Sequence, residues 1–150
     1  MKKQRSTLAR KGEVVRRKIH GNAHVDRNYA EADEFMSVFQ DVTDEFCWGT
    51  VWARPGLDQK TRAALSLVMG AAQNHTGAVK LHVKTCLRTG WKENEIAEML
   101  LHVYVYAGVY PSLSAFQIAR EAIAEFKQEG QGQAARSRRR TVIRHARPTS

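Results

Sequence analysis

The spacing of the apolar residues, which recur every three or four positions along nearly the whole chain, most constrains the fold. No run of roughly four to eight residues alternates apolar and polar side chains in the manner of a half-buried strand. Because helical spacing gathers apolar side chains on one face, the sequence predicts an all-α protein, a compact helical bundle. A chain of 150 residues that is 43% hydrophobic can bury one core, so we expect one folded domain.

The first two predicted helices flank a turn at Pro55-Gly56. The first spans residues 32–47, and its apolar stripe is Phe35, Val38, Phe39, Val42 and Phe46. Asp58 can cap the second helix, because its carboxylate can accept a free backbone N–H at the helix start. The predicted buried stripe of the second helix is Leu65, Val68 and Ala72.

Three more helices are predicted from their end signals. The third runs from Thr76 to Gly90, where a residue without a Cβ can close a helix. The fourth begins near Lys92 and continues through Tyr106. Pro111 fits the first turn of the fifth helix, whose apolar face is Phe116, Ala119, Ile123 and Phe126.

The net charge of +9 is concentrated at the two ends of the chain. Residues 1–20 hold eight Lys and Arg against one acid, residues 130–150 hold six Arg and no acid, and residues 21–129 hold 10 basic and 14 acidic side chains. A nucleic-acid module usually carries its basic face on the folded body, so this distribution argues against nucleic-acid binding. We interpret residues 1–17 as a basic extension, residues 18–129 as the helical domain, and residues 130–150 as a disordered Arg-rich tail.

Targeting and metal-binding signals are weak. The N-terminal segment has no apolar run of the kind that a secretory signal needs, which predicts a cytoplasmic protein. The uncharged stretch 99–116 contains His102 and Pro111, so a buried helix followed by a turn explains it better than a membrane span. Cys47 and Cys86 do not have the spacing of a zinc or thioredoxin-like motif, and we expect no metal and no disulfide.

The tract FCWGTVWARPGLD, residues 46–58, places two tryptophans, an arginine and a Pro-Gly turn directly before a capped helix. Together with Thr61-Arg62, Leu81-His82-Val83 and the segment VYAGVYP at 105–111, it resembles the carboxymuconolactone decarboxylase family over residues 18–126. Redox members of the wider hydroperoxidase-like superfamily carry a Cys-x-x-Cys-x-x-x-His run that this chain lacks. One departure is Ala78, which stands four residues before His82, where related decarboxylases usually have a glutamate.

The resemblance implies a small helical enzyme that needs no cofactor and assembles as a trimer or hexamer. Its implied reaction converts 4-carboxymuconolactone, or a related carboxylated lactone, into 3-oxoadipate enol-lactone and CO2 in the aromatic catabolism of protocatechuate. The departing carboxylate leaves its electrons in a dienolate that is then protonated. The protein must therefore hold the other carboxylate, stabilise the charge on the lactone oxygen and supply a proton.

Three side chains are candidates for acid–base chemistry. His82 is the first choice, because a histidine can donate a hydrogen bond and then a proton near neutral pH. His102 and Tyr106 follow Glu98 at four-residue spacing, which keeps all three on one helical face. Glu98 could orient His102, and Tyr106 could donate to a substrate oxygen. Each could instead have an ordinary surface or packing role.

The remaining candidates would bind the substrate. Arg54 and Arg62 could grip a carboxylate through two N–H groups, and Trp48 and Trp52 could exclude water, although tryptophans are more often core residues. Two alternative functions stay open. One is a thiol hydroperoxidase that uses Cys86 without a nearby resolving cysteine, and the other is a non-catalytic helical protein whose basic tails bind polyanions.

Overall fold

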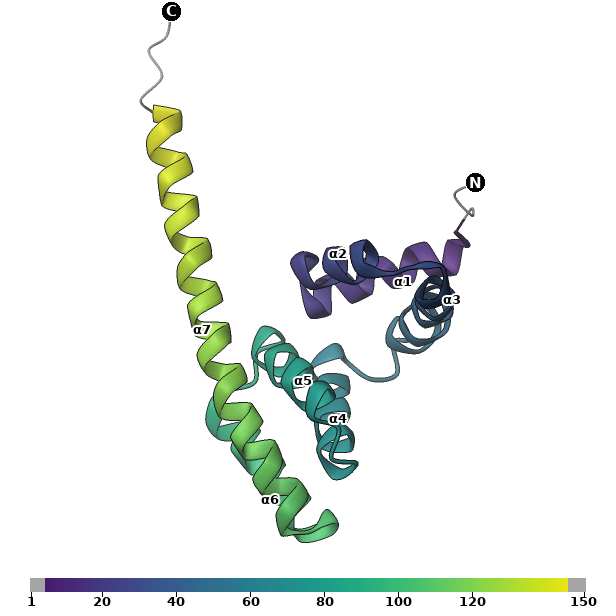
Figure 1. The fold of residues 1–150 in the computed structure, drawn as a ribbon, viewed down its shortest axis with the longest axis vertical. Helices are drawn as coiled ribbons and strands as arrows, with labels where there is room; N and C mark the ends of the chain where they lie inside the picture. The colour runs from purple at the N-terminus through teal and green to yellow at the C-terminus, as the bar shows by residue number, and fades with distance from the viewer. Residues whose placement is uncertain (1–4, 146–150) are drawn as a thin grey trace, which may run out of the picture.

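The computed structural model describes residues 5–145, and every regular element in that range is a helix, as predicted. The first half contains α1 (Thr7–His20), α2 (Asn22–Glu31), α3 (Glu34–Val42) and η1 (Thr43–Trp52), a π-helix. The second half contains α4 (Gln59–Ala72), α5 (Thr76–Arg88), α6 (Glu93–Ala107) and α7 (Val109–His145). Figure 1 shows the two halves as neighbouring groups of helices joined by the segment 53–58.

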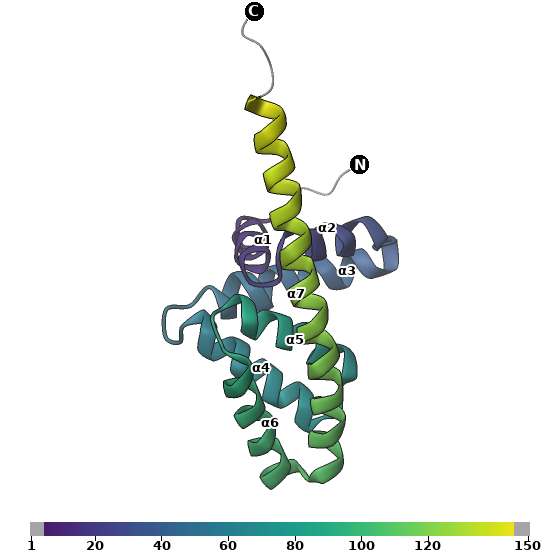
Figure 2. The ribbon, with the colours of Figure 1, turned by 90° about the vertical axis from the view of Figure 1, so that its left-hand side faces the viewer.

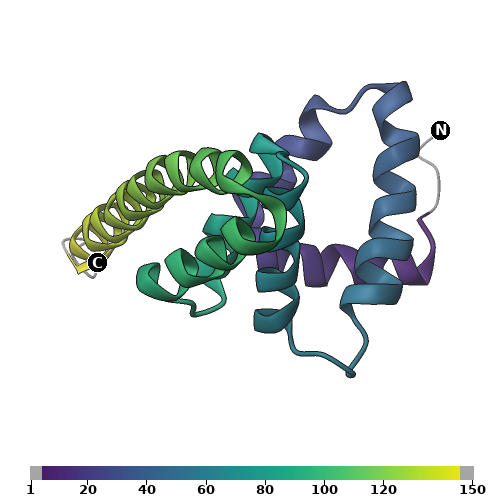
Figure 3. The same cartoon turned by 90° about the horizontal axis from the view of Figure 1, so that it is seen from below.

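Helix α7 is the longest element and ties the second half together. It packs along α5 and α6, and its C-terminal part continues beyond both (Figures 1 and 2). Helix α3 runs directly into η1 as one rod that crosses α1 (Figure 3). A single core spans both halves, because Ile19 of α1 and two tryptophans of η1 belong to the same buried cluster as the apolar residues of α4 to α7.

Two glycines allow α1 and η1 to pack backbone against backbone. A Cβ on Gly12 would overlap the carbonyl oxygen of Asp44, and a Cβ on Gly49 would overlap the carbonyl oxygen of Leu8. Residues 7–17, which the charge pattern had suggested were an extension outside the domain, therefore form most of a packed helix. The charge run predicts a solvated segment, but Ala9, Gly12 and Arg16 supply α1 with a buried face.

The predicted end signals act at the expected places. The Asp58 carboxylate accepts the backbone N–H of Thr61 at 2.7 Å, and Gly90 has a φ of 93° just after α5. The backbone N–H of Lys92 donates to Glu95 at 2.7 Å at the start of α6. Residues 99–116 form the end of α6, a break at Gly108 and the start of α7, and no helix in the described part of the chain is long and apolar enough to cross a membrane.

The apolar stripes predicted for the first two helices are not the faces that the chain buries. The stripe of the first predicted helix is exposed, with Phe35 at 84% and Phe39 at 64% of full exposure, as are Val38, Val42 and Phe46. The rod of α3 and η1 instead turns Gln40, Asp44, Trp48 and Trp52 inward. Periodicity identifies an apolar face but does not say whether the chain itself or another molecule covers it.

The buried face of α4 also differs from the prediction. Leu65 and Ala72 are exposed and Val68 is only partly buried, whereas the buried face is Ala63, Leu67, Gly70 and Ala71. Small residues face inward because α5 approaches closely: a Cβ on Gly70 would lie 3.1 Å from the Cβ of Ala78.

Helix α7 remains helical through His145, and its Val109 start places Pro111 in the first turn, as predicted. The sequence predicted disorder for residues 130–150, but residues 130–145 continue α7, where Gln, Ala and Arg favour a helix. The last five residues of the predicted tail lie outside the described range.

Candidate active site

A hollow of about 900 Å³ lies where the junction of α1 and α2 faces α5 and α7. We call it the basic hollow, because its lining includes four Lys or Arg side chains, two histidines and only two carboxylates: Arg27, Lys80, Lys84, Arg88, His20, His24, Glu125 and Glu129. The lining cations outnumber the carboxylates by two, which favours an anionic ligand.

His20 forms the inner wall of the basic hollow at the end of α1. Its Nδ1 lies 2.9 Å from the Thr85 hydroxyl, which donates its own hydrogen to the carbonyl of Leu81 at 3.0 Å. Because that hydroxyl can then only accept, His20 carries its proton on Nδ1 and leaves Nε2 as an acceptor. Burial, followed by nearby positive charge, lowers the pKa of His20 to about 3, so the imidazole is neutral.

His82 lies behind His20 on α5, with the two ring centroids 5.8 Å apart. Its Nδ1 is buried and has no hydrogen-bond partner among the residues that the structure describes. Burial lowers the pKa of His82 below its usual value. A buried polar atom without a partner is uncommon and is a reasonable place for a ligand to bind.

Two indoles of η1 support this pair of histidines. The Trp48 ring meets the His20 ring edge-on at 4.9 Å, and Trp52 stacks at a tilt on Trp48 at 4.7 Å. Both tryptophans are buried. They give the histidines an apolar backing that excludes water, and this low-polarity setting strengthens any charge interaction there.

Two of the four Lys and Arg side chains of the hollow are already paired. Lys84 contacts Glu125 at 2.7 Å and Glu129 at 2.8 Å, and Lys80 contacts Glu125 at 2.5 Å. Arg88 is different, because its guanidinium lies over the Phe126 ring at 5.4 Å. Lys80 and Lys84 therefore join α5 to α7, and Arg88 keeps its hydrogen-bond donors available.

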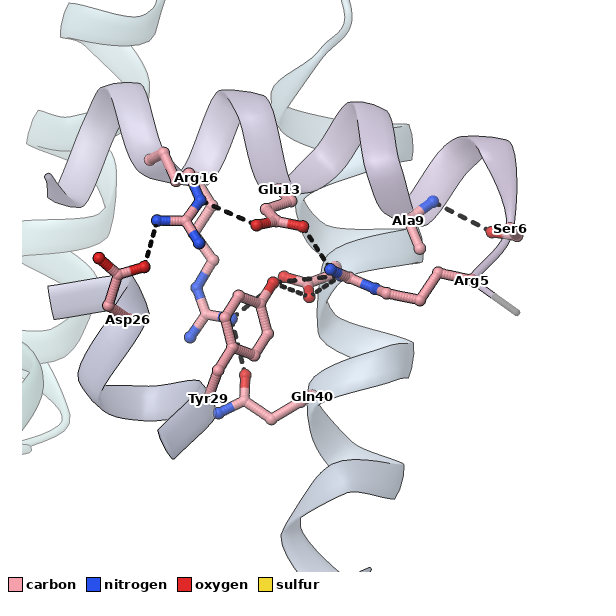
Figure 4. Close-up of polar contacts among 10 residues, drawn as sticks. Arg5, Ser6, Ala9, Glu13, Arg16, Asp26, Tyr29 and Gln40 are labelled. Carbon is pink, nitrogen blue, oxygen red and sulfur yellow. Dashed lines mark hydrogen bonds and ion pairs between the residues drawn. The ribbon is translucent and has the colours of Figure 1, made fainter. Parts of the chain in front are cut away.

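A buried polar network holds the elements that carry His20 and Trp48. Asp44 of η1 is fully buried and accepts from Tyr29 at 2.5 Å, from Arg16 at 3.1 Å and from Arg5. Arg16 also donates to Gln40 at 2.7 Å (Figure 4). Burial and the bond to Asp44 raise the pKa of Tyr29 to about 12. Because every partner is charged or hydrogen-bonded, the network fixes α1, α2 and η1 relative to one another.

The predicted site residues fall into three groups. His82, Trp48 and Trp52 come together through His20. His102 and Tyr106 are exposed on α6 with their rings 4.6 Å apart, Glu98 is exposed on the same helix, and no recorded contact in residues 5–145 joins any of the three to His82.

Arg54 and Arg62 lie at the turn after η1. Arg62 donates to the carbonyl of Leu57 at 3.3 Å and to that of Arg54 at 3.5 Å, so its contacts hold the turn. Neither arginine lines the basic hollow.

Sequence reasoning missed His20, His24 and Arg88. His20 and His24 flank Gly21, whose φ of 87° separates α1 from α2. A histidine pair around a helix-breaking glycine was the available signal, but it lay beside the basic run that we assigned to an extension.

The thiol of Cys86 is poorly suited to redox chemistry. It is fully buried, and burial raises its pKa to about 12. A reactive cysteine needs a lowered pKa and access to its oxidant. The hydroperoxidase alternative is therefore disfavoured.

The sequence matches the carboxymuconolactone decarboxylase family over residues 38–121. It is 31% identical over 116 residues to 4-carboxymuconolactone decarboxylase of Acinetobacter baylyi, covering 77% of this chain and 87% of that protein. It is 32% identical over 120 residues to nitrosuccinic acid decarboxylase of Metarhizium robertsii, covering 80% of this chain and 84% of that protein.

The chain therefore belongs to the carboxymuconolactone decarboxylase family, as its tryptophan tract predicted. Both relatives are decarboxylases by name, and the predicted enzyme class, a carboxy-lyase, is confirmed.

Proposed function

We propose that this chain removes CO2 from 4-carboxymuconolactone, or from a closely related dicarboxylic acid, at the basic hollow. The product from that lactone would be 3-oxoadipate enol-lactone, which places the enzyme in aromatic catabolism. The observation that carries the proposal is the position of two neutral histidines: His20 lines a hollow with excess positive charge, and the half-buried His82 lies behind His20, with the two ring centroids 5.8 Å apart. Such a site attracts a dianion and can return a proton to it.

The bond that breaks joins the ring carbon to its carboxylate. As CO2 departs, that electron pair moves through the adjacent C=C bond into the lactone carbonyl and forms a dienolate. A proton then adds to the ring carbon next to the lactone carbonyl, which restores the carbonyl and leaves the C=C bond at the carbon that lost the carboxylate. The reaction neither oxidises nor reduces the protein, and its balance needs no added cofactor.

His82 is the proposed proton donor. Burial keeps its pKa low in the free protein, but a bound dianion raises the pKa again, because negative charge nearby favours imidazolium. The imidazolium can stabilise the dienolate oxygen and then release its proton to carbon. His20, fixed by Thr85 at 2.9 Å, would support the same oxygen or relay the proton.

The names of the two relatives favour the same substrate class. Carboxymuconolactone and nitrosuccinic acid are both dicarboxylic acids that carry an electron-accepting group, a lactone in one and a nitro group in the other. We propose that this chain needs both features in its substrate. A cytoplasmic location remains a prediction. The roles predicted from the sequence for His102, Tyr106 and Arg54 are alternatives, which the variants described below distinguish from the roles proposed for His82 and Arg88.

The test is to incubate the purified protein with 4-carboxymuconolactone and, separately, with nitrosuccinic acid, and to measure CO2 together with the organic product. We expect one CO2 for each enol-lactone formed from the first compound, well above the uncatalysed rate. If CO2 were released from nitrosuccinic acid alone, the chain would still be a decarboxylase, but 4-carboxymuconolactone would not be its substrate. No release above background from either compound would overturn the proposal.

A further inference from the structure

Arg88 has an unusual setting at the end of α5. A Cβ on Gly21 would lie 3.4 Å from its guanidinium carbon, and its guanidinium covers the Phe126 ring at 5.4 Å. Gly21 and the Phe126 ring are therefore both neighbours of this guanidinium, although Arg88 as a whole is exposed. Within residues 5–145, that guanidinium makes no recorded hydrogen bond or ion pair. Its five N–H donors therefore have no protein acceptor in that range.

The neighbouring lysines show the contrast. Lys80 and Lys84 face the same hollow, but Glu125 and Glu129 neutralise them at 2.5 to 2.8 Å. Burial lowers the pKa of Arg88, and the negative charge of Glu129 only partly opposes this effect. A partly desolvated cation is stabilised by an anion that arrives with the ligand.

Arg88 also lies at the correct end of the hollow for a second carboxylate. A Cβ added to Gly21, the residue that follows His20, would be in van der Waals contact with the Arg88 guanidinium. Burial is the main cause of the lowered pKa values of His20 and His24, and the positive charge of Arg88 contributes to both. Arg88 is therefore close to the histidine wall. It is the last residue of α5, the helix that also carries Thr85 and His82.

We infer that Arg88 binds the carboxylate that stays on the product, and that it makes the site selective for dicarboxylic over monocarboxylic substrates. This inference rests on the proposed function. Guanidinium can grip a carboxylate through two parallel hydrogen bonds, which an ammonium group cannot reproduce. The φ of 87° at Gly21 favours glycine there, which leaves the space beside the guanidinium open for a ligand.

The kinetic test compares 4-carboxymuconolactone with its analogue in which the retained carboxylate is a methyl ester. For Arg88→Ala we expect KM for the diacid to rise about 10- to 100-fold with kcat within a few fold, and the preference for diacid over ester to disappear. Arg88→Lys should recover only part of the affinity. Arg120→Ala, an exposed arginine of α7 that lies outside the hollow, removes the same charge and should leave both constants unchanged.

A binding test that needs no turnover separates this inference from the proposed function. Calorimetry with succinate should show binding to the wild type and a loss of about tenfold or more in Arg88→Ala. If the wild type decarboxylated neither compound but bound succinate through Arg88, the proposed function would fail and the role of Arg88 would stand. Unchanged KM, unchanged diacid preference or unchanged succinate affinity in Arg88→Ala would overturn the inference, as would a KM increase in Arg54→Ala alone.

Discussion

At the scale of single residues, the histidine wall links stability to pH. His20 has an unfolded pKa near 6.5 and a folded pKa of about 3. Between these values the unfolded chain binds a proton that the folded chain does not bind. The contribution of the neutral His20 ring to the free energy of unfolding is therefore fully present above pH 6.5. It decreases as the pH falls toward 3. His24 and His82 have pKa values shifted in the same direction and add to the effect.

His20→Gln should weaken this pH dependence. Each histidine that stays neutral in the fold contributes a slope of about 1.4 kcal/mol per pH unit in that window. Urea unfolding at pH 7.0 and pH 5.0 should show a larger loss of free energy of unfolding for the wild type than for His20→Gln, by about 2 kcal/mol. An equal loss in both proteins would show that His20 is not held neutral by the fold.

The candidate site was only partly predictable from residue types. The sequence identified His82, Trp48 and Trp52, because they lie in tracts that resemble the family. It missed His20 and Arg88, because nothing local shows that the end of α1 meets the end of α5. It also grouped His102 with His82, because spacing within one helix carries no information about which helix faces which.

At the scale of helices, the sequence predicted the existence and starts of α4 to α7 well, but it missed the C-terminal end of α7. The predicted face of α7 does pack on the core at Phe116, Ala119 and Ile123, whereas the buried face of α4 was predicted poorly. Asp58, Gly90 and Pro111 act locally, so their effects can be read without a fold. Which face of a helix is buried depends instead on the elements that pack against it. Helix α4 buries Leu67 and exposes Leu65, although both are leucines on the same helix. The π-helix at 43–52 had no sequence signal that we recognised.

The backbone contact between α1 and η1 predicts a strong effect of one methyl group. Gly49→Ala would push a Cβ into the carbonyl of Leu8, and overpacking of this kind typically costs about 1 to 3 kcal/mol. Gly132→Ala is the matched control, because a Cβ there meets nothing within 4 Å and alanine favours a helix. Thermal unfolding should show a clear decrease for the first variant and no decrease for the second. Equal midpoints would contradict the close packing.

Truncation tests the Arg-rich end of the chain. Deleting residues 132–150 keeps Glu129, which pairs with Lys84 at 2.8 Å, and Gly130, which lines the hollow. We expect an unchanged thermal midpoint and unchanged kcat, with weaker binding to a polyanion such as heparin at low salt. A midpoint lowered by several degrees would mean that the segment stabilises the domain.

At the scale of the whole molecule, one copy of the chain leaves two apolar faces uncovered. The first is the α3–η1 stripe at Phe35, Val38, Phe39, Val42 and Phe46, and the second lies around the turn between α6 and α7, at Val105, Tyr106, Val109, Tyr110 and Leu113. Faces of this kind usually mark an interface. The trimer or hexamer implied by the family resemblance would cover them with other copies of the chain.

Light scattering should therefore return a particle several times larger than the 17.0 kDa chain. Phe39→Asp and Val105→Asp place a charge on each face in turn, and we expect either one to reduce the particle mass without unfolding the helices. Leu67→Asp, in the core, should unfold the protein instead. A wild-type particle of one chain at micromolar concentration would contradict the oligomer.

The proposed mechanism places decarboxylation at the basic hollow and makes His82 the proton donor. Its most direct test is kcat for CO2 release from 4-carboxymuconolactone by the wild type, His82→Ala and His102→Ala, with circular dichroism to confirm folding. The account predicts a decrease of about 10²- to 10⁴-fold for His82→Ala, the usual effect of losing a general acid, and a change within a few fold for His102→Ala. Full kcat in His82→Ala together with a collapse in His102→Ala would contradict the account and move the chemistry to the exposed face of α6.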